Sequence, residues 1–147
     1  MSKVAQPRWI KPMNRIMKAV HQLGVPIGPP MILTVPGRKS GYPRSTPITP
    51  FEHDGGLYVV TGVPGSDWGA NAKAAGVGTL TRGRKSRRVE IVELSATEAD
   101  PVLRTYAAKV PIGVRVAKRA GLVRNGAPEE FAALVDRLTV FRFDSIN

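Results

Sequence analysis

The residues best suited to chemistry lie in a cationic loop bracketed by two glycines, GRKSGYPR at positions 37–44. Glycine lets the backbone turn tightly, so that amide groups and the Ser40 hydroxyl can converge on one anion. Arg38 and Arg44 can each hold phosphate oxygens through two N–H groups, while Lys39 acts as a point charge. The pattern predicts an anion site, and the plain alternative is a charged turn that faces water.

The sequence offers little other machinery for chemistry. It contains no cysteine, which excludes disulfides, thiolate metal sites and cysteine nucleophiles. Its two histidines, His21 and His53, cannot form a clustered metal site, so no metal is expected. Glycine-rich nucleotide motifs and the G-x-S-x-G nucleophile motif are also absent. Hydrolysis therefore has no visible basis, and the catalytic residues stay unknown.

The charge of the chain favours an anionic partner. Its 147 residues include 22 Lys and Arg against 11 Asp and Glu, a formal net charge of +11. Residues 1–94 hold 14 of the basic and 5 of the acidic side chains, so the partner is expected to meet that part. Nucleic acid, anionic lipid and a polyanionic small molecule all meet this requirement.

The N-terminal part of the chain predicts an amphipathic helix within residues 1–24. Apolar residues recur at helical spacing over positions 9–23, with Lys11, Arg15 and Lys18 on the other side. The helix either packs on the core or touches an anionic membrane surface. No apolar run reaches the roughly 18–20 residues of a membrane span, and cations interrupt any secretory signal. We expect a cytoplasmic location, with peripheral contact at the inner membrane face as the variant.

Short strands should dominate the middle of the chain. We expect them at residues 31–35, 46–51, 57–61, 77–81 and 89–94, with a closing strand at 139–143. Asp54-Gly55-Gly56 is a hairpin signal, since glycine adopts positive φ without strain. Pro47 and Pro50 place the second strand at an edge or a bulge. Residues 82–88 are predicted to form a cationic turn.

Helices are expected around and after these strands. Ser66 and Ser95 are candidate N-caps of helices that end at Ala75 and near Lys109, and Ser95 with Glu98 forms a capping box. Two further helices are predicted at residues 114–119 and 128–138. The pattern favours an α+β fold in which about six mostly antiparallel strands form a small barrel with flanking helices. We expect one domain over residues 1–147, with the barrel core and loop at 30–95, a helical region at 96–138 and the closing strand at 139–143.

One stretch of the chain resembles a known family. ILTVPGRKSGYPRSTP at residues 32–47 is similar to the signature of the deazaflavin-dependent nitroreductase family, oxidoreductases that use coenzyme F420 and have a split β-barrel fold. The similarity continues through the Asp54-Gly55-Gly56 turn and the segment 59–62, and Trp68 with Asn71 resembles the family's W-x-x-N motif. It covers about residues 30–95.

The resemblance implies a binding role for fourteen residues. Four would hold the cofactor's phosphate and acidic tail, three would follow its side chain and ring edge, four would meet the deazaflavin ring, and three would close over it. In that order they are Arg38, Lys39, Ser40 and Arg44; Ser45, Thr46 and Pro47; Val60, Thr61, Gly62 and Val63; and Asp67, Trp68 and Asn71.

The implied activity is hydride transfer from reduced F420 to an electron-poor small molecule such as a quinone, an activated alkene or a nitro compound. Residues 109–113 lack the tyrosines that line the substrate pocket of the family's best known nitroreductase, which disfavours activation of nitro-prodrugs. Thr61 and Tyr106 are candidate donors of the final proton. The oligomeric state is open, with a homodimer as one option.

Two other interpretations remain open. The same barrel hosts FMN-binding and haem-binding proteins, so FMN is the nearest alternative cofactor. A nucleic-acid-binding domain could use residues 37–44 and 82–88, but an aromatic content of 6% provides no stacking platform. We therefore expect no nucleic acid partner.

Overall fold

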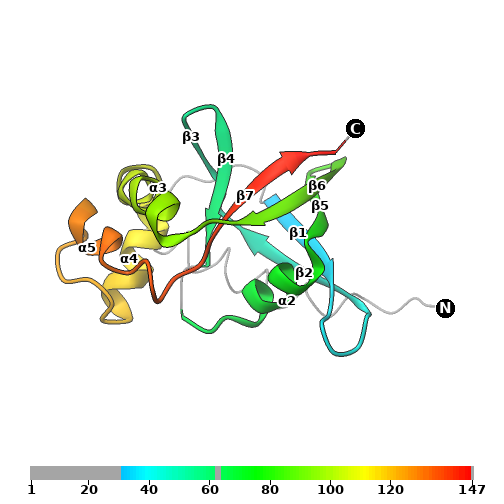
Figure 1. The fold of residues 1–147 in the computed structure, drawn as a ribbon, viewed down its shortest axis with the longest axis horizontal. Coiled ribbons are helices and arrows are strands. Elements are labelled where there is room, and N and C mark those ends of the chain that lie inside the picture. Colours follow the sequence, from blue (N-terminus) through cyan, green and yellow to red (C-terminus); the bar gives the residue numbers. More distant parts are fainter. Residues whose placement is uncertain (1–30, 62–63, 147) are drawn as a thin grey trace.

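The computed structural model describes residues 31–61 and 64–146 (Figure 1). In the described part, seven strands form one sheet in the order β2-β1-β5-β6-β7-β4-β3. The strands are β1 (Met31–Pro36), β2 (Pro43–Ile48), β3 (Phe51–His53), β4 (Gly56–Val60), β5 (Val77–Arg82), β6 (Lys85–Glu93) and β7 (Val140–Ser145). The helices are α2 (Asp67–Ala75), α3 (Ala96–Lys109), α4 (Pro111–Arg119) and α5 (Pro128–Ala132). The predicted helix at 9–23, together with Gly62 and Val63, lies outside the described residues.

Every neighbouring pair in the sheet is antiparallel, and the sheet curls into a half-barrel, which confirms the α+β split-barrel prediction. Seven strands are present where about six were expected, because the predicted strand at 46–51 is two strands. The chain leaves edge strand β2 after Ile48 and joins edge strand β3 at Phe51. Pro50 lies at that break, where a residue without an N–H group costs no ladder hydrogen bond.

Two hydrophobic cores fix the sheet and its helices. One core lies inside the curled sheet beneath α2 and includes Leu33, Val59 and Phe141. The other lies between the sheet and the α3–α5 group, around Leu103 and Phe131, both fully buried. Figure 1 shows α3, α4 and α5 gathered on one side of the sheet, while α2 packs against β1, β5 and β6. The strand ends that carry the predicted site thus have α2 as their helical neighbour.

Local sequence signals account for most element boundaries. The β3–β4 turn is confirmed: Asp54 and Gly55 have φ of 47° and 80°, as a two-residue hairpin turn of type I′ requires. The Ser95–Glu98 capping box is present, and α3 ends at Lys109 as predicted. Within the described part of the chain, no helix has the length and hydropathy needed to cross a membrane.

Three other predicted boundaries were wrong by three residues or more. Strand β6 begins at Lys85, because Ser86 and Arg87 pair with β5, and the cationic turn shrinks to residues 83–84. The helix predicted at 128–138 is only α5, after which hydrogen bonds between residues three apart, such as Leu134 N to Phe131 O at 2.9 Å, form tight turns. Helix α4 begins at Pro111 rather than at residue 114, since proline fits the first helical turn.

Candidate functional site

The loop between β1 and β2 is closed by its own backbone. Gly37 N donates to the Tyr42 carbonyl at 2.8 Å, and Gly41 N donates to the Gly37 carbonyl at 2.9 Å. Tyr42 N donates to Ser40 Oγ at 3.2 Å. Gly41 has φ of 77°, a value that residues other than glycine rarely adopt. The sequence therefore builds a compact turn that presents its side chains outward.

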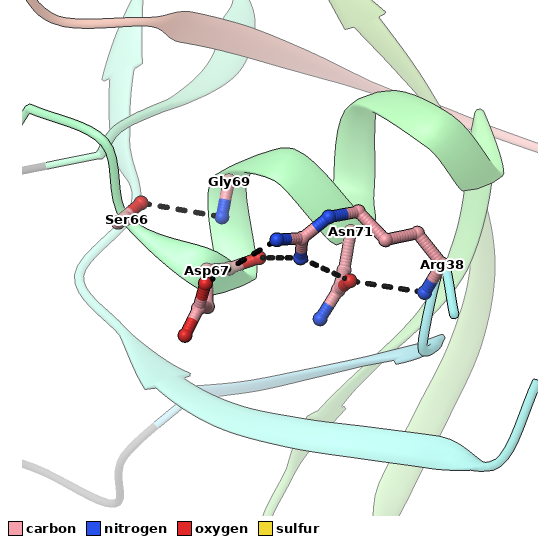
Figure 2. A network of polar contacts seen from close by, with 5 residues as sticks. All are labelled: Arg38, Ser66, Asp67, Gly69 and Asn71. Atoms are coloured by element: carbon pink, nitrogen blue, oxygen red, sulfur yellow. Dashed lines mark hydrogen bonds and ion pairs between the residues drawn. The ribbon is translucent and has the colours of Figure 1, made fainter. Parts of the chain in front are cut away.

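Arg38 connects this loop to helix α2 (Figure 2). Asn71 Oδ1 accepts two hydrogen bonds from Arg38, one from the backbone N at 3.0 Å and one from Nη1 at 2.8 Å. The same guanidinium donates to the Asp67 carbonyl and lies 3.4 Å from Asp67 Oδ1. Three residues predicted for the site thus form one network. In it the Arg38 guanidinium is directed at α2, so Arg38 positions the loop, a role that sequence reasoning missed.

Helix α2 is held where Arg38 can reach it. Ser66 Oγ accepts from Gly69 N at 3.2 Å and caps the helix. A Cβ atom at Gly69 would lie 2.8 Å from both Ser66 Oγ and Thr61 Cγ2, so glycine allows the helix to approach the end of β4 closely. Asn71 is only 8% exposed, and Trp68 lies half-buried against Phe141 with ring centroids 6.2 Å apart. The network therefore rests on a well-packed element.

The remaining polar residues of the loop are exposed, and two of them share one face. A Cβ atom at Gly37 would lie 3.0 Å from Ser40 Oγ and 3.3 Å from Arg44 Nε, so both side chains cover the same glycine. Among the described residues, neither Lys39 nor Arg44 has a salt-bridge partner. Two unneutralised cations, a hydroxyl and a tight backbone turn suit a ligand with several negative charges.

The predicted residues on strand β2 lie along the barrel edge below the loop. Ser45, Thr46 and Pro47 are half-buried. The Ser45 hydroxyl shares a 2.7 Å hydrogen bond with Thr34 on β1, so it braces the strand pair. A ligand that starts at Arg44 and follows these residues would run along an edge whose outer side carries no further strand in the described sheet.

The end of β4 is tied to the chain that enters β7. Thr61 N donates to the Thr139 carbonyl at 3.0 Å, and Thr61 Oγ1 accepts from Thr139 N at 3.2 Å. Val60 is buried in the core that faces α3. Two cavities in the described part of the chain have linings that include none of the predicted cofactor-binding residues. The structure thus brings the loop and α2 together, whereas Val60 faces away into the core.

Tyr106 is a core residue rather than a proton donor. It is 3% exposed and lies between the rings of Phe51 and Phe131, at centroid distances of 5.6 and 5.4 Å. Burial raises the pKa of its phenol to about 12, which makes it a weaker acid. The described residues contain no group of three or more His, Cys, Asp or Glu side chains that could hold a metal ion.

Comparison with known proteins adds a family and confirms the fold. The family model for F420H2-dependent quinone reductase matches residues 9–120. No protein with a curated description matches the sequence.

Solved structures resemble the chain at low sequence identity. They include Atu2129 of Agrobacterium tumefaciens, a protein of unknown function, with 15% identity, a TM-score of 0.57 and coverage of 100% of this chain and 60% of that one. PhzG of Burkholderia lata, in complex with tetrahydrophenazine-1-carboxylic acid, has 16% identity and a TM-score of 0.54 over 97% and 82% of the two chains. A NimC/NimA family protein of Clostridium acetobutylicum has 17% identity and a TM-score of 0.52 over 90% and 80%. At these identities the likeness concerns the fold alone.

The family match spans most of the chain and includes the loop, the edge strand and α2. The cationic loop also has the donors that an anionic cofactor tail requires. The chain belongs to the F420H2-dependent quinone reductase family, and it is an F420-dependent reductase.

Proposed function

We propose that the protein reduces a small quinone or activated alkene and binds F420 across the loop at residues 37–44, edge strand β2 and the start of α2. The main support for this binding site is that the loop holds two cations, Lys39 and Arg44, with no salt-bridge partner among the described residues. The Arg44 side chain covers Gly37. Beside them, the hydrogen bonds from Arg38 to Asn71 hold the loop against α2. The family match supports a quinone as the acceptor.

In this proposal the protein binds and orients, while the cofactor supplies the reactive hydride. Lys39, Arg44 and Ser40 hold the phosphate and carboxylates of the tail. Asn71 and Asp67 keep Arg38, and with it the loop, in one conformation before the ligand arrives. That order lowers the entropy cost of binding. The Thr61–Thr139 hydrogen bonds fix the end of β4, where the resemblance places the ring.

The reaction needs no acid–base pair from the protein. A quinone becomes a hydroquinone when it gains one hydride and one proton, and water can deliver the proton. Tyr106 is too deeply buried for that task, and Thr61 is only 9% exposed. Positioning and exclusion of water are then the main contributions of the chain.

A turnover assay with three acceptors tests the acceptor class. Oxidation of reduced F420 is followed by absorbance under anaerobic conditions with menadione, cyclohexenone or a nitroimidazole. We expect a higher kcat/KM for menadione or cyclohexenone than for the nitro compound. A preference for the nitroimidazole would overturn the proposed class and leave the binding site untouched.

Contact with membranes through residues 9–23 stays a prediction from the sequence, and so does a homodimer. Sedimentation with anionic vesicles tests the first, and light scattering of the purified protein tests the second.

A further inference from the structure

A concave site lies at the barrel end opposite the loop. The antiparallel register places the starts of β1, β4 and β6 at this end, together with the end of β5: Met31 pairs with Arg82, and Arg82 pairs with Lys85. The loop at 37–44 follows the other end of β1. A cavity of about 470 Å³ opens here, and its lining among the described residues includes apolar Met31, Phe51 and Leu57 and basic Arg82, Arg87 and Lys109.

The apolar part of this cavity is supported by both cores. Met31 and Leu57 pack against the core inside the sheet. Phe51 is 5% exposed and belongs to the core beneath α3. Side chains backed by a packed core keep their positions, so the cavity has a firm apolar floor. Its volume falls in the range of about 300–1,000 Å³ that is typical of small-molecule sites.

The rim of the cavity is cationic. Three cations line it, against the single carboxylate of Glu52. Arg87 Nη1 donates to Ser145 Oγ at 3.0 Å, and Lys109 Nζ donates to the Glu52 carbonyl at 2.9 Å. Both acceptors are neutral, so they orient the two side chains without cancelling their charge. Among the described residues, no salt bridge involves Arg82, Arg87 or Lys109.

We propose that this cavity binds a small organic anion in which an apolar body carries one carboxylate or sulfonate group. The apolar floor would take the body, and Arg82 and Arg87 would hold the anionic group. The chain's own N-terminal residues are a poor occupant, because residues 1–30 carry five Lys and Arg and no Asp or Glu. This site is separate from the proposed cofactor site, and its test does not depend on F420.

Fluorescence of 8-anilinonaphthalene-1-sulfonate with the full chain tests the proposal. We expect saturable binding to one site, unchanged by saturating F420. Dodecanoate and 1-naphthoate serve as competitors, and their ranking distinguishes an aliphatic from an aromatic body. Dodecanol, which lacks the charge, should compete far more weakly than dodecanoate.

Two double variants separate a built site from general attraction to a basic surface. Arg82→Gln with Arg87→Gln should weaken probe binding about tenfold, which corresponds to about 1.4 kcal/mol. Arg84→Gln with Arg88→Gln removes the same charge from the same hairpin, at residues that do not line the cavity. This control variant should change the affinity for the probe by less than about twofold. Thermal unfolding confirms that both variants are folded. Equal losses in the two variants, displacement of the probe by F420, or binding that does not saturate would each overturn the proposal.

Discussion

Replacement of Asn71 by alanine tests whether Arg38 acts on the loop or directly on the cofactor. Asn71 Oδ1 accepts a charge-assisted hydrogen bond at 2.8 Å and a backbone hydrogen bond at 3.0 Å from Arg38. The Arg38 side chain is 32% exposed, so water replaces part of what is lost. Each bond then contributes about 0.5–1 kcal/mol. If the loop must be ordered when the cofactor binds, F420 affinity should fall by about 5–30-fold.

A double-mutant cycle shows which mechanism holds. We expect Asn71→Ala, Arg38→Ala and the double variant to weaken F420 binding by similar factors, because all three release the same contact. Isothermal titration of each variant measures these affinities. If Arg38 instead held the cofactor itself, Arg38→Ala would cost far more affinity than Asn71→Ala, because it would remove a direct contact with an anion as well as the contact with Asn71. A loss in Arg38→Ala more than about tenfold larger than that in Asn71→Ala would therefore refute the positioning role.

Two further variants control for other causes. Asn71→Asp keeps the acceptor oxygen and should lose less affinity than Asn71→Ala. Lys73 lies on the same helix and forms an exposed ion pair with Glu93 at 3.4 Å, so Lys73→Ala should leave F420 affinity unchanged.

Three more predictions concern the loop, α2 and the core. Lys39→Ala and Arg44→Ala should each weaken F420 binding about tenfold at low salt and less at high salt. Their melting temperatures should stay near that of the wild type, and unchanged F420 affinity in both variants would contradict the assignment of these two residues to the binding site. Gly69→Ala should destabilise the fold by about 1–3 kcal/mol in urea unfolding, because its Cβ would lie 2.8 Å from side-chain atoms, and an unchanged midpoint would show that α2 can shift freely. Tyr106→Phe should keep kcat and should lessen the loss of stability at alkaline pH. A phenol whose pKa is raised in the folded state stabilises the fold below its ordinary pKa of 10.0, and this contribution, up to about 2 kcal/mol, disappears as pH rises toward about 12. A large fall in kcat would restore Tyr106 as a proton donor.

Local chemistry explains which elements the sequence predicts well. The Asp54-Gly55 turn and the Ser95–Glu98 capping box each depend on residues within a few positions, so they can be recognised without tertiary information. The charged start of β6 shows the opposite case. Residues 85–88 are exposed and lack apolar alternation, so they resemble a turn until pairing with β5 reveals the strand.

Tertiary contacts explain what was missed. Arg38 and Asn71 are 33 residues apart, and an arginine in a cationic loop resembles an anion ligand when its partner is unseen. The helix expected at 128–138 failed for a related reason: Phe131, Leu134 and Leu138 reach the same core from tight turns as they would from a helix. The cavity at the barrel end opposite the loop is lined by residues from separate parts of the chain, so no short sequence motif predicts it.

The most direct test of the central claim is a titration of the purified protein with F420, with FMN in parallel, at low and high salt. We predict saturable F420 binding that weakens as salt rises, since the loop cations meet a polyanionic tail, and little or no binding of FMN. Absence of F420 binding, or a preference for FMN, would contradict the assignment of F420 to the loop and helix α2.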